Sequence, residues 1–397
     1  MSRKKVGLIF YLSILILIVA SGFIGYLFGN RNLRLNEKYT PELVNIDVGK
    51  PNDVNFSLFW EAYRKLVNNY VGEIDQKDFL YRAIAGSFTA TNDPYTNFLP
   101  PEDTKEFENE LSGELEGIGI RIGILEEMPA VIAPLSGSPA EQAGLKARDK
   151  ILKIDDQDTL TLTLDQAVDL IRGKSGTKVR LTVLRGEEEK VFEVTRAKIN
   201  VETVELSYSG DVAILAINEF GVDTKEEFLD KANDIKGKGV EKVVLDLRNN
   251  PGGLLDGAVD VASEFFENGK LIVSEEGKGY KRELKTSGNS ILKNVKLVVL
   301  VNGGSASASE ILAGAIKDYQ RGKIIGEKTF GKGTVQQYEN LSDGSSVKIT
   351  IAKWLTPNGT SIDKNGIEVD IEEKEPDNAL FAKEDQLVKR AIEELSK

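Results

Sequence analysis

The sequence predicts a multi-domain α/β protein, and three features carry this prediction. Residues 6–29 form an uncharged, mostly apolar run, residues 112–198 contain short alternating strands, and residues 199–375 alternate apolar strands with helices. Strands that alternate regularly with helices are typical of an α/β core. The 397 residues are enough for two or three domains with substantial cores.

The N-terminal segment predicts a single-pass transmembrane anchor. Its apolar run follows the basic residues Arg3, Lys4 and Lys5 and is long enough to cross about 30 Å of hydrocarbon as a helix. A cleaved signal peptide is the alternative, although its apolar region normally covers only about 7–15 residues. Because basic residues stay on the cytoplasmic side, we expect residues 1–5 inside the cell and the later domains outside the cytoplasmic membrane.

The segments between the anchor and the core differ in composition and in the spacing of their apolar residues. Residues 30–52 are polar and hold prolines, which predicts a linker. Apolar residues at helical spacing predict a helical region over residues 53–111. Two short helices are expected among the strands that follow, one beginning near Ser138 and one over residues 164–171.

The last part of the chain has the pattern of an α/β sheet with a terminal helix. Residues 297–301 read as a buried strand, and residues 271–273 and 346–353 are expected to extend the same sheet. Residues 376–397 predict a C-terminal helical tail. The site of any chemistry is then expected in the turns between these strands and helices.

Composition excludes several kinds of site. The chain has no histidine and no cysteine, so a Ser-His-Asp triad, a thiol nucleophile and disulfides are impossible. The net charge of −12, with no basic stripe, argues against a nucleic-acid partner. We expect no metal site and no cofactor.

Residues 302–337 hold the predicted chemical centre. An apolar strand ends at two glycines, serines follow at every second position, and a helix begins near Glu310. A helix N-terminus offers unpaired N–H groups and a partial positive charge, which suits an oxyanion that forms beside a hydroxyl. Ser307 with Glu310 is also an ordinary capping box, and this is the structural alternative.

A lysine amine is the base that remains for such a serine. Lys332 stands between two glycines, and the chain from Ser307 is long enough for a helix to lead away and a strand to return. Lys328 is the rival base, although a lysine next to a glutamate on a strand is usually a solvated surface charge. If residues 332–336 are extended, Gln336 lies on the same face as the lysine, where its amide can hold the amine.

The run SASASEILAGAIKDYQRGKIIGEKTFGKGTVQ resembles the signature of the C-terminal processing peptidases, also called tail-specific proteases. The resemblance covers most of the chain outside the N-terminal tail and implies a serine peptidase with a Ser-Lys dyad. It implies that Ser307 is the nucleophile, Lys332 the general base and Gln336 the residue that orients the base. It also implies that the amides of Ala308 and Gly253 form the oxyanion hole.

Residues 112–198 resemble a PDZ domain, notably in the stretches PAEQAGL and LIRGKSG. The resemblance implies that Gly117, Ile118, Gly119 and Ile120 form a loop whose amides bind the terminal carboxylate of a peptide, while the next strand pairs with that peptide. An ordinary β-turn is the alternative for the two glycines. Proteins or peptides with apolar C-termini are the expected substrates.

These features together predict a membrane-anchored serine endopeptidase that processes or degrades extracytoplasmic proteins from near their C-termini. The first alternative is a catalytically inactive, membrane-tethered PDZ scaffold that only binds peptides. The second is a tethered acyl-transfer or isomerase enzyme on a similar scaffold, for which the sequence offers no acyl-carrier site. A homodimer through the helical region is expected by analogy alone.

Overall fold

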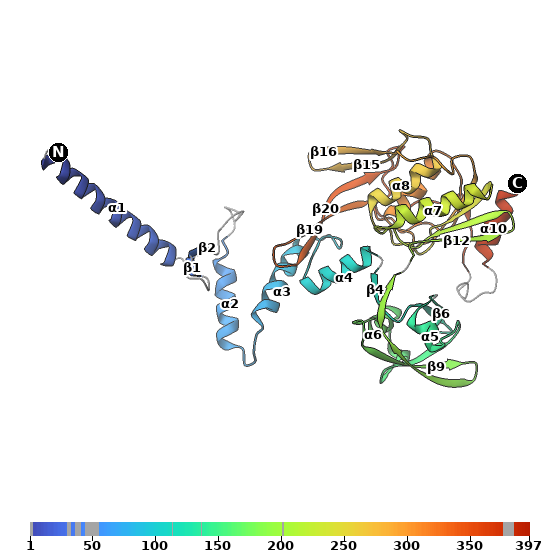
Figure 1. Ribbon diagram of the computed structural model, residues 1–397, viewed down its shortest axis with the longest axis horizontal. Coiled ribbons are helices and arrows are strands. Elements are labelled where there is room, and N and C mark those ends of the chain that lie inside the picture. Colours follow the sequence, from blue (N-terminus) through green and yellow to red (C-terminus); the bar gives the residue numbers. More distant parts are fainter. Residues whose placement is uncertain are drawn as a thin grey trace. The chain divides into compact units, whose positions relative to one another are not determined.

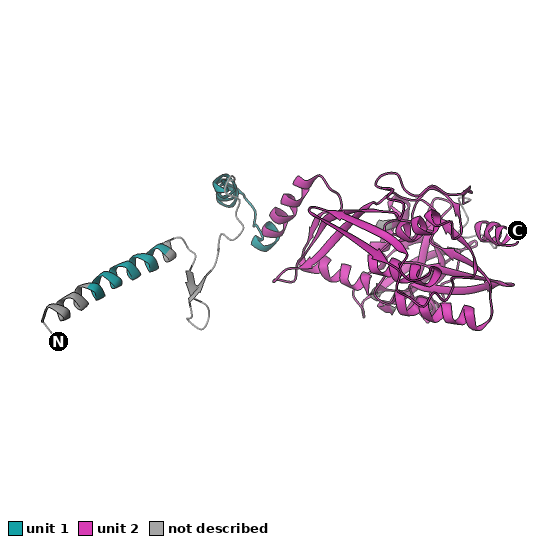
Figure 2. Ribbon diagram, turned by 90° about the horizontal axis from the view of Figure 1, so that it is seen from above, with its two compact units in different colours: residues 1–79 teal, residues 80–397 magenta. Residues whose placement is uncertain are grey.

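The computed structural model describes residues 3–29, 33–35, 41–43, 55–112, 114–135, 137–200, 202–375 and 385–397. The chain divides into two compact units, residues 1–79 and residues 80–397 (Figure 2). This boundary falls inside helix α3 (Gln76–Phe88), within the region predicted as one helical block. Residues 1–2, most of the predicted linker 30–52 and residues 376–384 lie outside the described residues.

The first unit begins with helix α1 (Arg3–Gly29), which covers the apolar run expected to be an anchor. A short antiparallel hairpin of β1 (Leu33–Leu35) and β2 (Pro41–Leu43) follows. Among the helices that the structure describes, none is long and apolar enough to cross a membrane. The anchor expected over residues 6–29 stays a prediction.

Helices are present where the helical region was predicted. α2 (Ser57–Asn69) packs its aromatic side chains against the start of α3, with Phe59 and Phe79 ring centroids 6.2 Å apart and Tyr63 and Phe79 centroids 4.9 Å apart. No residue of α2 is buried, and Trp60 is 53% exposed. α4 (Pro101–Leu111) completes the helices of this region, after a short 3₁₀ turn and strand β3 (Asn97–Leu99).

The β-rich region forms a sheet with the order β10-β9-β7-β6-β5, in which β8 pairs with β7. Its elements are β4 (Glu114–Gly117), β5 (Ile120–Leu125), β6 (Met128–Pro134), α5 (Pro139–Ala143), β7 (Lys150–Ile154), β8 (Gln157–Asp158), α6 (Leu164–Ile171), β9 (Lys178–Arg185), β10 (Glu188–Thr195) and β11 (Ala197–Asn200). Both predicted helices are confirmed: Ser138 caps α5, and α6 covers residues 164–171. β5 is left at one edge of this sheet.

The main sheet of the second unit has six strands in the order β12-β13-β14-β17-β18-β21. β12 and β13 are antiparallel, and the other neighbours are parallel. Its strands are β12 (Val204–Ser209), β13 (Val212–Ile217), β14 (Lys242–Asp246), β17 (Lys296–Val301), β18 (Lys323–Gly326) and β21 (Ile371–Glu372). The predicted α/β core is thus confirmed, and the structure shows that its sheet is mostly parallel.

Helices cover both faces of this sheet (Figure 1). On one face, Val243 and Leu245 join the core cluster that also contains the buried sides of α7 (Thr224–Gly237), α8 (Leu255–Phe265) and α9 (Ala308–Asp318). On the other face, Val244 packs with Leu387 and Ala391 of α10 (Gln386–Leu395). Successive strand residues point to opposite faces, so alternate positions of β14 belong to different cores.

A second, antiparallel sheet corrects one prediction. Residues 271–273 and 346–353 were expected to extend the main sheet, but they lie in β15 (Leu271–Gly277) and β20 (Ser346–Leu355) of a sheet ordered β16-β15-β20-β19. Its other strands are β16 (Tyr280–Lys285) and β19 (Thr334–Asn340), and β3 also pairs with β20. Near its end β20 alternates, with Ala352 and Trp354 buried and Lys353 exposed, which is typical of an antiparallel sheet with one solvated face.

Candidate active site

The predicted nucleophile lies at the carboxyl edge of the parallel strands. β14 ends at Asp246 and β17 at Val301, and each strand leads through a tight turn into a helix, α8 or α9. Because β14 and β17 are neighbours in the sheet, the turns of residues 247–254 and 302–307 lie beside each other. Ligand sites of open α/β sheets form at this edge.

Ser307 occupies the turn before α9 in a strained backbone conformation. Its φ is 52° and its ψ is −113°, and the residue is half-buried. A positive φ is uncommon for a residue other than glycine and persists only where the surroundings hold it. The Ser307 amide donates to the Glu310 carboxylate at 2.9 Å, which holds the turn. The hydroxyl therefore sits at the N-terminus of α9, next to the first helical amide, that of Ala308.

Two glycines of the neighbouring turn pack against this serine. A side-chain carbon on Gly252, whose φ is 106°, would lie 2.6 Å from the Ser307 Cβ and 3.0 Å from the Ala308 nitrogen. A side-chain carbon on Gly253 would collide with the carbonyl of Phe220, with which Gly253 forms an isolated bridge. Only glycine fits at either position. Within the described part of the chain, no hydrogen bond occupies the amide of Gly253 or of Ala308.

Asn250 joins the two turns into one hydrogen-bonded unit. Its side chain is buried, donates to the carbonyl of Ile217 at 2.7 Å and accepts from the amide of Gly252 at 2.9 Å. Its backbone carbonyl accepts from the Ala306 amide at 3.0 Å and from the Ser309 hydroxyl at 3.1 Å. The position of the nucleophile relative to the glycine pair is therefore set by the backbone and by this asparagine.

The buried carboxylate of Glu310 connects the nucleophile to the lysine loop. One of its oxygens accepts from the Ser307 amide and the Lys332 amide, both at 2.9 Å. The other accepts from the Thr329 hydroxyl at 2.6 Å and the Gly331 amide at 2.7 Å. Glu310 is fully buried, so these four donors replace the water that the charge has lost. The structure thus brings Ser307 and Lys332 together through one side chain.

The Lys332 amine lies over an aromatic ring in a partly buried environment. Its Nζ is 4.7 Å from the ring centroid of Tyr95. Burial lowers the pKa of Lys332, the nearby charge of Lys348 lowers it further, and the carboxylates of Asp93 and Glu310 oppose both effects. The net shift favours the neutral amine, which is the form that a general base requires.

The proton-transfer contact itself is not formed in this structure. Among the described residues, no hydrogen bond joins the Ser307 hydroxyl to the Lys332 amine, which lies over the ring instead. The amide of Gln336 donates to the hydroxyls of Thr334 at 2.9 Å and Thr350 at 3.2 Å. The expected role of Gln336 in holding the lysine amine therefore stays a prediction.

The sequence did not predict the contacts that Glu310 and Tyr95 make with the lysine segment. The capping-box spacing signalled only the contact of Glu310 with Ser307, and no local pattern connects Tyr95 to Lys332. Lys328 pairs with Glu368 at 2.6 Å, with both side chains more than half exposed. It is the solvated surface charge that its sequence context indicated.

A groove at the edge of the β-rich sheet contains the loop predicted to bind a carboxylate. It has a volume of about 220 Å³ and lies between β5 and α6. Gly119 has a φ of 75°, and a side chain there would collide with Ser138, so this turn requires glycine. The groove is lined mainly by aliphatic side chains: Ile118, Ile120, Ile122, Leu135, Val168, Ile171 and Ile199. This arrangement suits an apolar side chain next to a terminal carboxylate.

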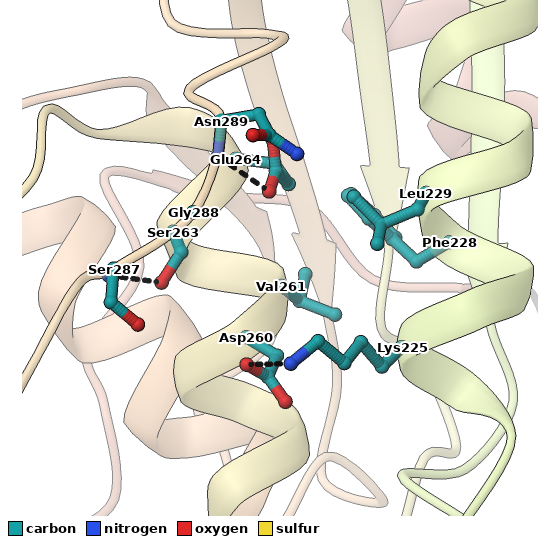
Figure 3. A pocket seen from close by; sticks show the side chains of 10 residues that line it. All are labelled: Lys225, Phe228, Leu229, Asp260, Val261, Ser263, Glu264, Ser287, Gly288 and Asn289. Carbon is teal, nitrogen blue, oxygen red and sulfur yellow. Dashed lines mark hydrogen bonds and ion pairs between the residues drawn. The ribbon is translucent and has the colours of Figure 1, made fainter.

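A second hollow, of about 120 Å³, lies between α7, α8 and the loop of residues 287–289 (Figure 3). Its charged groups are already paired. Lys225 contacts Asp260 at 3.0 Å, and the buried Glu264 accepts from the Asn289 amide at 3.1 Å. These bonds join the loop to the helices, so this hollow is a structural junction.

Comparisons with known proteins agree with this geometry. Residues 211–373 match the model of peptidase family S41, and residues 131–185 match that of a PDZ domain. A probable CtpA-like serine protease of Staphylococcus aureus (strain MSSA476) is 41% identical over 327 residues, which is 82% of this chain and 66% of that protein. The corresponding protein of Staphylococcus epidermidis is 39% identical over 326 residues, with the same coverage. The chain thus spans 66% of the length of these curated relatives.

Solved structures point the same way. The photosystem II D1 C-terminal processing protease is 31% identical, with a TM-score of 0.52 over 80% of this chain and 87% of its own. A putative S41 protease from Bacteroides fragilis shares the fold, with a TM-score of 0.57 at 18% identity over 84% of this chain and 94% of its own. On the strength of these matches and of the Ser307 turn, the chain belongs to peptidase family S41, the C-terminal processing serine proteases.

Proposed function

We propose that this protein is a serine endopeptidase that cuts proteins near their C-termini with a Ser307–Lys332 dyad. The single observation that carries the proposal is the buried Glu310 carboxylate, which binds the backbone amides of both residues. A carboxylate in this place holds the serine turn and the lysine loop in one frame. A scaffold that only bound peptides would have no need of this arrangement.

The geometry supports acyl transfer. The Ser307 hydroxyl attacks the scissile carbonyl while the neutral Lys332 amine takes its proton. The oxyanion forms next to the amides of Gly253 and Ala308, which no described group occupies and which lie in the two joined turns. The ammonium of Lys332 then gives its proton to the leaving amine, and water attacks the acyl-enzyme with the lysine again as base.

The Ser-Lys assignment is tested with a fluorescence-quenched peptide that ends in a free aliphatic residue. Ser307→Ala and Lys332→Ala should each abolish cleavage, whereas Lys328→Ala, which removes a solvated lysine of the same segment, should retain it. Retention of near-normal turnover by Lys332→Ala above pH 7 would falsify the role of this lysine as the base.

We propose that the groove between β5 and α6 captures the substrate's C-terminus. Its aliphatic lining and its glycine turn support recognition of a terminal carboxylate that follows apolar residues. Charge-assisted hydrogen bonds to a carboxylate contribute about 1.5–3 kcal/mol. Amidation of the peptide's C-terminus should therefore lower kcat/KM by roughly ten- to a hundredfold, and equal kcat/KM values for acid and amide would argue against capture.

We also propose that residues 6–29 anchor the protein in the cytoplasmic membrane with the peptidase domain outside. The basic cluster and the uncharged apolar run of the sequence support this proposal. Protease added to spheroplasts should digest the peptidase domain, and a carbonate wash should leave the chain in the membrane fraction. Recovery of a soluble mature chain that begins near Gly22 would favour a cleaved signal peptide instead.

A homodimer is a further proposal, which the exposed apolar side chains of α2 support. Leu58 is 73% and Trp60 is 53% exposed, and surfaces of this kind often mark contacts between proteins. Sedimentation of the fragment that begins at Asp53 should show a dimer, which Leu58→Lys should dissociate. A monomer at all concentrations would exclude it.

A further inference from the structure

The turn of residues 93–96 is a rigid element fixed to the second sheet. The Asp93 carboxylate accepts from the Tyr95 amide at 3.1 Å and from the Thr96 hydroxyl at 2.7 Å, which forms a side-chain-stabilised turn. The Thr96 hydroxyl in turn accepts from the Thr350 amide of β20 at 2.9 Å. Strand β3, which follows directly, pairs with the same strand. The backbone from which the Tyr95 ring projects is therefore held by hydrogen bonds within the turn and to β20.

The Lys332 amine contacts this ring. The backbone of Lys332 is held by Glu310 at its amide and by the indole of Trp354 at its carbonyl, 3.0 Å away. The amine lies 4.7 Å from the Tyr95 ring centroid, within the range of a cation–π interaction. Hydrogen bonds thus hold the backbone of Lys332, and the Tyr95 ring contacts its amine.

The charged groups around the amine come from three elements. Lys348 of β20 repels the ammonium, whereas Asp93 of the turn and Glu310 of α9 attract it. Burial raises the pKa of the Tyr95 phenol, and the nearby carboxylates of Asp363, Asp93 and Glu310 raise it further. The phenol therefore stays neutral at the pH of catalysis, and it is the face of an uncharged ring that meets the amine.

We propose that Tyr95 is a positioning residue for Lys332, whose ring face holds the lysine amine in the site and stabilises its charged form. The inference rests on the proposed role of Lys332 as the base. An electron-rich ring face attracts an ammonium but not a neutral amine, so the ring opposes the deprotonation that activates the lysine. It keeps the amine in place between turnovers and limits the pH range in which the amine is free to act.

The test is the pH dependence of kcat/KM for a fluorescence-quenched peptide with a free aliphatic C-terminus. Activity requires the neutral amine, so kcat/KM rises with pH through the pKa of Lys332. Loss of the ring in Tyr95→Leu removes stabilisation of the ammonium and should move this rise to lower pH by about 0.5–1.5 units. The rate at the plateau should also fall, because the amine has lost its platform. Tyr95→Phe keeps the ring face and should keep the wild-type profile.

Two further variants separate this role from a packing role. Pentafluorophenylalanine at position 95 keeps the ring shape and reverses its electrostatic face, so it should shift the profile in the same direction as leucine even if the leucine variant folds poorly. Tyr208→Leu is the matched control, since it removes a contact of the same kind, with Lys238 Nζ 4.3 Å from the Tyr208 ring centroid, outside the site. It should leave the profile unchanged.

The rate at which a fluorophosphonate labels Ser307 provides a second readout that does not depend on peptide capture. The labelling rate should show the same shift in its pH dependence. Wild-type profiles for both the leucine and the pentafluoro variants would overturn the proposal for Tyr95. The dyad is tested separately, because an active Lys332→Ala enzyme would refute the role of Lys332 as the base. If Lys332→Ala is inactive but the variants at position 95 keep the wild-type pH profile, only the role of the Tyr95 ring is refuted.

Discussion

The two halves of the candidate dyad are carried by different parts of the fold. Ser307 and the glycine pair, Gly252 and Gly253, lie in adjacent turns at the edge of the main sheet, where Asn250 and the backbone bond the two turns to each other. The lysine lies just before β19 of the second sheet, and its amine rests on a turn from the N-terminal part of the same unit. The nucleophile side is therefore pre-organised by its own sheet, whereas the base side depends on contacts between separate segments.

This contrast indicates where the site can be adjusted. A change within the joined turns should displace Ser307 and the Ala308 amide directly, because the packing leaves no free space around Gly252. A change on the base side should alter the position or protonation of the amine while the nucleophile turn stays intact. Glu310 is the one described side chain that hydrogen-bonds to both.

The largest expected effect follows from this link. Glu310→Gln replaces one carboxylate oxygen with an NH₂ group, which cannot accept a hydrogen bond. The two donors that bonded to this oxygen then lose their buried hydrogen bonds and face another donor instead. We expect a loss of at least about 3 kcal/mol in the free energy of unfolding and a fall in kcat/KM of at least a hundredfold. Urea unfolding and peptide cleavage measure the two effects.

Glu264→Gln is the matched control for that variant. Glu264 lies near the end of α8, is 3% exposed and accepts from two backbone amides, that of Asn289 at 3.1 Å (Figure 3) and that of Ile291 at 3.0 Å. It should lower stability but leave the kcat of the folded enzyme unchanged. If Glu310→Gln behaved in the same way, the carboxylate would stabilise the fold without coupling the two sides.

The next effect tests the nucleophile side alone. Gly252→Ala introduces a carbon 2.6 Å from the Ser307 Cβ and 2.8 Å from the Ala306 carbonyl oxygen, at a φ of 106°. We expect a loss of about 2–4 kcal/mol in the free energy of unfolding and loss of fluorophosphonate labelling at Ser307. Gly269→Ala is the control, because its φ is 83° but nothing lies within 4 Å of the added carbon. It should cost only about 1–2 kcal/mol and leave labelling intact.

A smaller effect is expected on the base side. Gln336→Ala removes the amide that donates to Thr334 and Thr350, at a net cost of about 1 kcal/mol. If the amide also holds the lysine amine during catalysis, kcat should fall by roughly five- to tenfold while KM stays within about twofold. An unchanged kcat would restrict Gln336 to supporting the second sheet.

The same contrast explains how much the sequence could reveal. The strand–turn–helix junction at Ser307, the glycine pair and the helix over residues 164–171 depend on neighbours in the chain, and local patterns predict them. The second sheet and the ring under Lys332 depend on segments far apart in the sequence, which no local spacing reports. β15 was therefore assigned to the wrong sheet, and no local pattern connected Tyr95 to Lys332.

Glu310 lies between these two cases. Its spacing from Ser307 predicts the cap that the structure contains, because a capping box is a local interaction. Its hydrogen bonds to Thr329, Gly331 and Lys332 form only because the fold brings residues 329–332 back beside the start of α9. A buried carboxylate with four donors is visible only once both segments are in position.

The smallest effect concerns Arg248, which lies in the turn between β14 and the glycine pair. Its guanidinium contacts Asp246, Asp385 and the carboxylate of Glu375, and its side chain is 9% exposed. Burial would raise the pKa of Asp385, but the hydrogen bond from Arg248 and those from the Val388 and Leu387 amides outweigh it, and the net shift is downward. A carboxylate with a lowered pKa in the folded state stabilises the protein above its unfolded pKa of about 3.9 and loses that contribution as pH falls further.

Asp385→Asn should therefore cost only about 1 kcal/mol at pH 7, because the Asp385 side chain is 41% exposed and Arg248 keeps two other carboxylates. The difference from wild type should shrink as pH falls below about 4, where the native aspartate also becomes protonated. The kcat should not change, since the joined turns are held by Asn250 as well. A large loss of activity would mean that α10 positions the oxyanion turn through Arg248, and the nucleophile side would then depend on a distant segment just as the base side does.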